Sequence, residues 1–154
     1  MVDAFIGGLG TGLKKKVVAL ETIATQATAL SHPNPDRALH DLDETLKSLE
    51  SGEAQKVMQQ IFDAWSKSDI SKFEQFPDWC ECMRTPEERV QMTRLNDDRN
   101  VDMARQITQM LDDSKRVFVA VGSLHMIGSK GLPALLREQG AIVTYIPLAM
   151  QLQQ

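Results

Sequence analysis

The chain has 154 residues, of which 42% are hydrophobic and 25% are charged, and its formal net charge is −4. This composition is close to that of average soluble globular proteins, so it argues against disorder and against fibrous repeats. The length fits a single domain, which we assign to residues 1–154. Without a dense basic face, nucleic acid is not expected as a partner. We also expect no membrane span, because no apolar stretch approaches the roughly twenty residues that one needs.

The first half of the chain alternates between short apolar runs and helical patterns. Residues 16–20 (Lys-Val-Val-Ala-Leu) are apolar and β-branched, which predicts a buried strand, and a helix is expected to start near Thr22. Two prolines in 31–35 predict a loop. A helix is then predicted from about residue 35 to 50 and ends at Gly52. Its stripe has apolar residues at spacings of three, four and three: Leu39, Leu42, Leu46 and Leu49.

The middle of the chain is predicted to be helical throughout. Apolar residues repeat with the helical period in 57–65, and a shorter helix is expected over 70–76. From Thr85, the sequence Thr-Pro-Glu-Glu is typical of a helix start, with an N-cap, proline in the first turn and acids near the positive end of the dipole. This helix is expected to run to about Leu111.

The last forty residues predict a strand, a helix and a second strand. The strands are 116–121 and 141–146, and the helix between them is 132–139, with Gly140 as its C-cap. Such a unit has the size of a right-handed crossover. We therefore predict an α/β fold with a short, mostly parallel sheet and a helical insertion, residues 35–112, between the first and second strands.

Two ionisable residues follow the predicted strands, where the carboxyl ends of parallel strands place functional groups. Glu21 directly follows 16–20, and His125 lies four residues beyond Val121, after a glycine. If these strands are neighbours, the carboxylate and the imidazole share one crevice, where they could hold a metal or divide acid and base roles. Taken alone, an acid such as Glu21 is more often a helix-capping or solvated group, and a lone histidine after a strand, such as His125, is more often structural.

Four segments carry a resemblance to a known family. They are 18–22 (Val-Ala-Leu-Glu-Thr), 95–100 (Leu-Asn-Asp-Asp-Arg-Asn), 117–128 (Val-Phe-Val-Ala-Val-Gly-Ser-Leu-His-Met-Ile-Gly) and 131–140 (Gly-Leu-Pro-Ala-Leu-Leu-Arg-Glu-Gln-Gly). In order and spacing they resemble the C-terminal half of the TraB/GumN family. The Trp79-Cys80-Glu81-Cys82 segment is similar to that of periplasmic GumN-like members.

The resemblance implies a metal-dependent hydrolase acting on peptides or proteins, because the family is related to the Tiki peptidases. It implies that Glu21, Arg99 and His125 are catalytic, that Glu21 and His125 bind a divalent metal (manganese, cobalt or zinc), and that Asn100 and Gly122 contact substrate. Gly122 and His125 would form a Gly-x-x-His motif. A metal would activate a water and polarise a carbonyl, while Arg99 would orient Glu21 or stabilise an oxyanion.

The sequence also departs from the family pattern. The family has two Gly-x-x-His motifs, and here no other histidine follows a glycine by three residues. The chain is therefore expected to lack an N-terminal half, to bind metal weakly, since a catalytic zinc-type site uses about three protein ligands, and to form a homo-oligomer or pair with the missing half. Full-length relatives would be periplasmic, whereas this chain, without a signal peptide, is expected to be cytoplasmic.

Three alternatives stay open from sequence. The chain could instead be a non-catalytic peptide-binding or regulatory module, or an inactive fragment. Arg99 could pair with Asp97 or Asp98 on the surface rather than with Glu21. Cys80 and Cys82 could form a small-ring disulfide, pair with another chain, or remain thiols.

Overall fold

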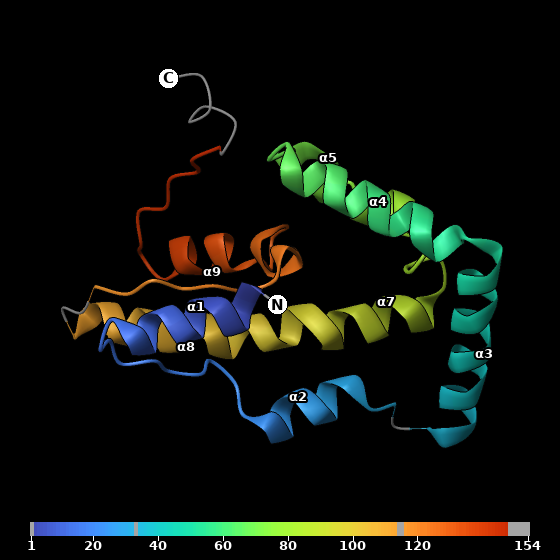
Figure 1. Ribbon diagram of the computed structural model, residues 1–154, viewed down its shortest axis with the longest axis horizontal. Coiled ribbons are helices and arrows are strands. Elements are labelled where there is room, and N and C mark those ends of the chain that lie inside the picture. Colours follow the sequence, from blue (N-terminus) through green and yellow to red (C-terminus); the bar gives the residue numbers. More distant parts are fainter. Residues whose placement is uncertain (1, 33, 114–115, 148–154) are drawn as a thin grey trace.

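The computed structural model describes residues 2–32, 34–113 and 116–147, and within these ranges the fold is entirely helical (Figure 1). One helix is a single π-helical turn, η1, and another is a 3₁₀ turn, η2. The elements are α1 (Val2–Gly12), α2 (Ile23–Leu30), α3 (Pro35–Ser51), α4 (Glu53–Ser66), α5 (Ile70–Glu74), α6 (Phe76–Trp79), α7 (Pro86–Met92), η1 (Thr93–Asp97), α8 (Asp98–Asp112), η2 (Ser123–Met126) and α9 (Leu132–Glu138).

The expected α/β fold with a parallel sheet is wrong. The three predicted strands, 16–20, 116–121 and 141–146, are extended, but no ladder of backbone hydrogen bonds joins them within the described ranges. Figure 1 shows why: no two of the three extended segments lie side by side, and 141–146 leads away from the end of α9. An apolar β-branched run forms a strand only where a second strand pairs with its backbone, because the hydrogen bonds of a sheet are made between segments.

The helix boundaries agree better with the sequence signals. Thr22 caps α2 through its side chain, which accepts from the N–H of Thr25 at 3.1 Å. Thr85 and Glu88 form a complete capping box at the start of α7. Gly52 ends α3 with φ 78°, a left-handed conformation that glycine adopts without steric cost. The predicted helix from Thr85 to Leu111 is confirmed in extent, although α7 and α8 are joined through η1.

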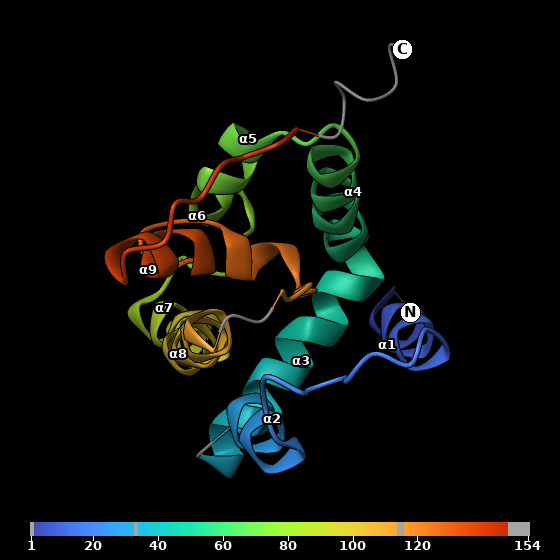
Figure 2. The same cartoon turned by 90° about the vertical axis from the view of Figure 1, so that its left-hand side faces the viewer.

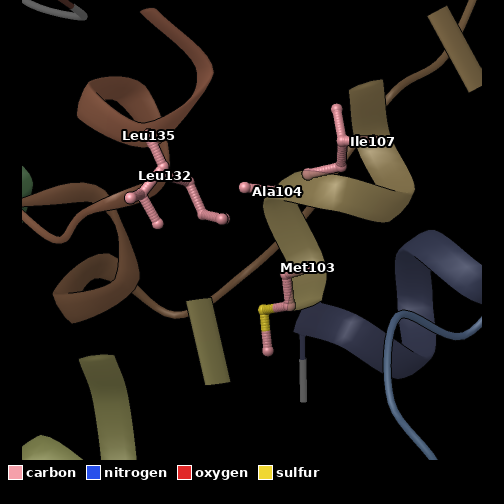
Figure 3. Packing of buried hydrophobic residues seen from close by; sticks show 5 residues of the cluster. All are labelled: Met103, Ala104, Ile107, Leu132 and Leu135. Carbon is pink, nitrogen blue, oxygen red and sulfur yellow. The ribbon is translucent and has the colours of Figure 1, made fainter. Parts of the chain in front are cut away.

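The hydrophobic core lies between α8 and α9. Its buried side chains are Met103, Ala104 and Ile107 from α8, and Leu132 and Leu135 from α9 (Figure 3). Leu20, Val119 and Val121, from two of the extended segments, pack against this cluster. The predicted helix over 132–139 is therefore confirmed as α9, and it packs on α8 rather than between two strands.

The other helices surround this core loosely. Figure 1 draws α1 across α8, but Figure 2 shows α1 well clear of it. α3 stands at one end of the molecule and packs mainly on α4. No described helix is both long and apolar enough to cross a membrane. The assignment of 1–154 as one domain, with 35–112 as an insertion, stays a prediction.

Candidate functional site

α8 brings the acid and the arginine of the sequence prediction together. Arg99 donates from Nε to Oε1 of Glu21 at 2.7 Å and from Nη2 to Oε2 at 2.5 Å, so the guanidinium grips both carboxylate oxygens. The two residues are 78 positions apart in the chain. This bidentate geometry is the strong form of an arginine–carboxylate pair. The alternative pairing of Arg99 with Asp97 or Asp98 does not occur.

This ion pair is shielded from water. The side chain of Glu21 is 7% exposed and that of Arg99 is 18% exposed. The Arg99 hydrogen bonds and charge hold the pKa of Glu21 below its usual 4.5, against the opposing effect of burial. Arg99 also donates from Nη1 to the carbonyl of Leu95 at 2.7 Å. Three of the five guanidinium N–H groups are thus used, and no described residue accepts from the other two.

Asn100, the residue that follows Arg99 in α8, binds the side chain of His125. Asn100 is 0% exposed, and its Nδ2 donates to the carbonyl of Lys130 at 2.8 Å. Its Oδ1 therefore faces Nδ1 of His125, 2.6 Å away. An amide oxygen can only accept, so Nδ1 must carry the proton and Nε2 keeps its lone pair in the neutral ring. Burial lowers the pKa of His125 below its usual 6.5, and the charge of Arg99 lowers it further, while Glu21 and Asp97 act in the opposite sense.

The turn that carries His125 explains the Gly-x-x-His spacing. The backbone N–H of His125 donates to the carbonyl of Gly122 at 3.0 Å and closes a 3₁₀ turn. Gly122 has φ −60°, which any residue can adopt, and a Cβ there would lie 3.7 Å from His125 Cδ2. The structure therefore gives Gly122 a backbone role in positioning His125, and its predicted contact with substrate stays a prediction.

Two further residues support the site, and sequence reasoning missed both. Gln106, about two turns after Arg99 on α8, donates to the carbonyl of Leu20 at 2.8 Å and so fixes the residue before Glu21. Asn96, in η1, donates to the carbonyl of Leu124 at 3.1 Å and fixes the residue before His125. The sequence does contain a pattern that could have indicated these two residues, because polar side chains recur at helical spacing at Asn96, Arg99, Asn100 and Gln106. The same pattern is also typical of the solvent-exposed face of a helix, so it did not distinguish the two cases.

The Glu21–Arg99 pair lines an open groove of about 930 Å³ between the 19–29 segment and the first half of α8. Three arginines border this groove, Arg94, Arg99 and Arg105. Arg94 donates to the carbonyls of Ala29 at 3.1 Å and of Ser31 at 2.5 Å, so it ties α2 to η1. His125 does not line the groove. Glu21 and Arg99 therefore line the groove. His125 lies outside the lining and is held by the side chain of Asn100, the residue after Arg99.

The residues present do not make a complete metal site. Within the described part of the chain, no three or more side chains of His, Cys, Asp and Glu come together in a way that could hold an ion. Of the two predicted ligands, Glu21 already has a guanidinium on both oxygens, and His125 offers only Nε2. A catalytic ion of the zinc type needs about three protein ligands, so we derive no chemical step through a metal.

The two cysteines are joined to each other. Cys80 and Cys82 form a disulfide in the segment between α6 and α7, which selects one of the three alternatives left open from sequence. Glu81 between them has φ 58°, and its carboxylate pairs with Arg84 at 2.7 Å.

The profile of the TraB/PrgY/gumN family matches residues 1–145, which is nearly the whole chain. The chain belongs to the TraB/PrgY/gumN family. The resemblance drawn from the four sequence segments is thereby confirmed at the level of the family. No curated protein and no solved structure matches the chain.

Proposed function

We propose that this TraB/PrgY/gumN-family chain carries part of a hydrolase active centre, peptidase-like in type, whose remaining groups come from outside the described residues. The observation that carries the proposal is the state of His125. A half-buried imidazole with a lowered pKa and a protonated Nδ1 is neutral at pH 7 and has a basic Nε2. This is the form in which histidine accepts a proton from water or binds a metal.

Arg99 supports the same proposal. Its two remaining N–H groups belong to a guanidinium that is 18% exposed and held by Glu21, so a carbonyl oxygen entering the groove would meet fixed hydrogen-bond donors. Such donors stabilise the oxyanion that forms when a carbonyl is attacked. Glu21 holds the guanidinium in place through both oxygens, which makes it a positioning residue in this account. A divalent ion, if further ligands complete its site, would supply an activated water.

The proposal is tested by peptide hydrolysis with added manganese or cobalt. Because the described residues carry only part of the centre, we expect at most slow cleavage by the chain, loss of that cleavage in His125→Ala, and retention in His40→Ala, in which an exposed histidine of α3 is removed as a matched control. Metal titration by calorimetry on the same three proteins is the second measurement. Metal uptake that falls in His125→Ala but not in His40→Ala supports the proposal, and equal uptake by all three contradicts it.

A non-catalytic binding module is the second candidate, and one observation favours it. Both oxygens of Glu21 are engaged by Arg99, so the predicted catalytic acid is not free to act as an acid or base in the groove of about 930 Å³ that it lines. This candidate predicts peptide binding without cleavage, unchanged by metal and by His125→Ala. Binding that weakens in Arg99→Lys, while His125→Ala behaves as wild type, would establish it over the hydrolase.

A further inference from the structure

α3 carries a row of exposed leucines that nothing in the described chain covers. None of its residues is buried, and it packs mainly on α4. Leucine side chains normally lose most of their exposure on folding, because each buried leucine contributes roughly 1.5–3 kcal/mol. Here the exposed fractions are 67% for Leu39, 54% for Leu42, 49% for Leu46 and 60% for Leu49.

The whole chain exposes more surface than a compact monomer of its size. Its accessible surface is 11,669 Å², whereas a compact monomeric protein of 17.2 kDa has about 7,800 Å². The excess is about 3,900 Å². A standard protein interface covers about 800 Å² on each partner. The excess is therefore several times what one stable contact with another molecule requires.

We propose that α3 pairs with α3 of a second copy of this chain, with the leucine row as the seam. The spacing of three, four and three is that of a two-helix seam, in which the apolar rows of two helices interlock. An identical row on each copy makes the contact self-complementary, so a two-fold pair closes without leaving an open end. This pairing does not depend on whether the chain hydrolyses peptides.

The charges beside the row are compatible with a contact between two copies. Lys47 pairs with both Asp43 at 2.7 Å and Glu44 at 2.8 Å on the same helix, which offsets one of these two negative charges, and Arg37 pairs with Asp41 at 3.3 Å. Acids that are already paired within each helix repel their counterparts less. The net charge of −4 for the whole chain is also small enough to allow self-association.

Sedimentation velocity of the full chain over a range of concentrations tests the pairing. We expect a species of twice 17.2 kDa that dissociates on dilution. Leu46→Glu should raise the dimer dissociation constant about 100-fold or more, because a two-fold dimer contains two copies of Leu46 and the substitution removes the contacts of both. Leu46→Ala should raise it about tenfold without adding charge. His40→Glu, an exposed change on another face of α3, should leave it within about twofold.

Circular dichroism on each variant shows whether α3 still folds, which is expected because these positions are exposed in the single chain. A wild-type chain that remains monomeric at every concentration overturns the proposal. So does a dimer that persists unchanged in both Leu46 variants, because the contact must then lie elsewhere. A larger open-ended assembly also overturns it, since a two-fold seam closes at two copies.

Discussion

Nδ1 of His125 lies 2.6 Å from Oδ1 of Asn100, and the same carboxamide donates to the carbonyl of Lys130 at 2.8 Å. Asn100 thus joins α8, the His125 turn and the loop before α9 at one fully buried point. The orientation of the amide fixes the tautomer of the imidazole, and Arg99, its neighbour on α8, fixes Glu21. Two consecutive residues of one helix therefore position both candidate groups.

The first prediction concerns the charge state of His125. Its imidazole should titrate below the usual 6.5 and carry its proton on Nδ1 at neutral pH, because burial disfavours the charged ring. Asn100→Asp places a carboxylate beside Nδ1 and should raise the pKa of His125 by about one unit or more. Imidazole ¹⁵N shifts measured against pH report both properties. A pKa at or above 6.5 in the wild-type chain, or an Nε2 proton, would contradict this assignment.

The second prediction concerns the stability contributed by Asn100. Asn100→Ala should lower the free energy of unfolding by about 2–3 kcal/mol, since it removes a fully buried carboxamide that bonds both the carbonyl of Lys130 and Nδ1 of His125. Asn96→Ala is the matched control, because Asn96 also donates to a loop carbonyl but is only half-buried, and it should cost about 1 kcal/mol. Urea denaturation measures both. Equal losses would mean that burial of Asn100 is not what makes it important.

The third prediction contrasts two glycines near the site. A Cβ at Gly131 would lie 2.4 Å from the carbonyl oxygen of Ile127, so Gly131→Ala should destabilise the fold by about 2 kcal/mol or more. A Cβ at Gly122 meets only His125 Cδ2 at 3.7 Å, so Gly122→Ala should change stability by no more than about 0.5 kcal/mol. Thermal unfolding of the two variants distinguishes them. If Gly122→Ala proves the more damaging, the backbone around His125 differs from that described.

The fourth prediction is the pH dependence of the Glu21 contribution. Because its pKa is lowered on folding, the ionised carboxylate stabilises the folded chain above pH 4.5, and this contribution is lost as the pH falls further. The difference in unfolding free energy between wild type and Glu21→Gln should therefore be largest near pH 6–7 and shrink below about pH 4. Denaturation at a series of pH values measures it. A difference that grows on acidification has the wrong sign for this account.

Sequence reasoning located most of the helices and the family, but it missed α1 and the architecture. The capping signals at Thr22 and Thr85 and the glycine after α3 are local, since each is decided within one turn of helix, and each was predicted correctly. The sheet was wrong because strand formation depends on a distant partner that composition cannot reveal. Residues 116–121 pack their alternate side chains on the α8–α9 core as a single extended segment.

The candidate site shows the same division between local and distant effects. Glu21, Arg99, Asn100 and His125 were selected from sequence, and the structure joins them in two pairs, Glu21 with Arg99 and His125 with Asn100. The pairing of Arg99 with Glu21 could not be chosen over Asp97 or Asp98 from sequence, because Asp97 and Asp98 are adjacent in the chain while Glu21 is 78 residues away. The link from Asn100 to His125 depends on how the His125 turn packs on α8, which no local pattern encodes.

The most direct test of the site is a double-mutant cycle between Glu21 and Arg99, using Glu21→Ala, Arg99→Ala and the double variant. A shielded bidentate pair should give a coupling energy of about 2 kcal/mol in unfolding experiments at pH 7. The exposed Asp102–Arg105 pair on the same helix, treated in the same way, should give about 0.3 kcal/mol. A coupling between Glu21 and Arg99 no larger than that of Asp102 and Arg105 would contradict the arrangement on which the proposed active centre rests.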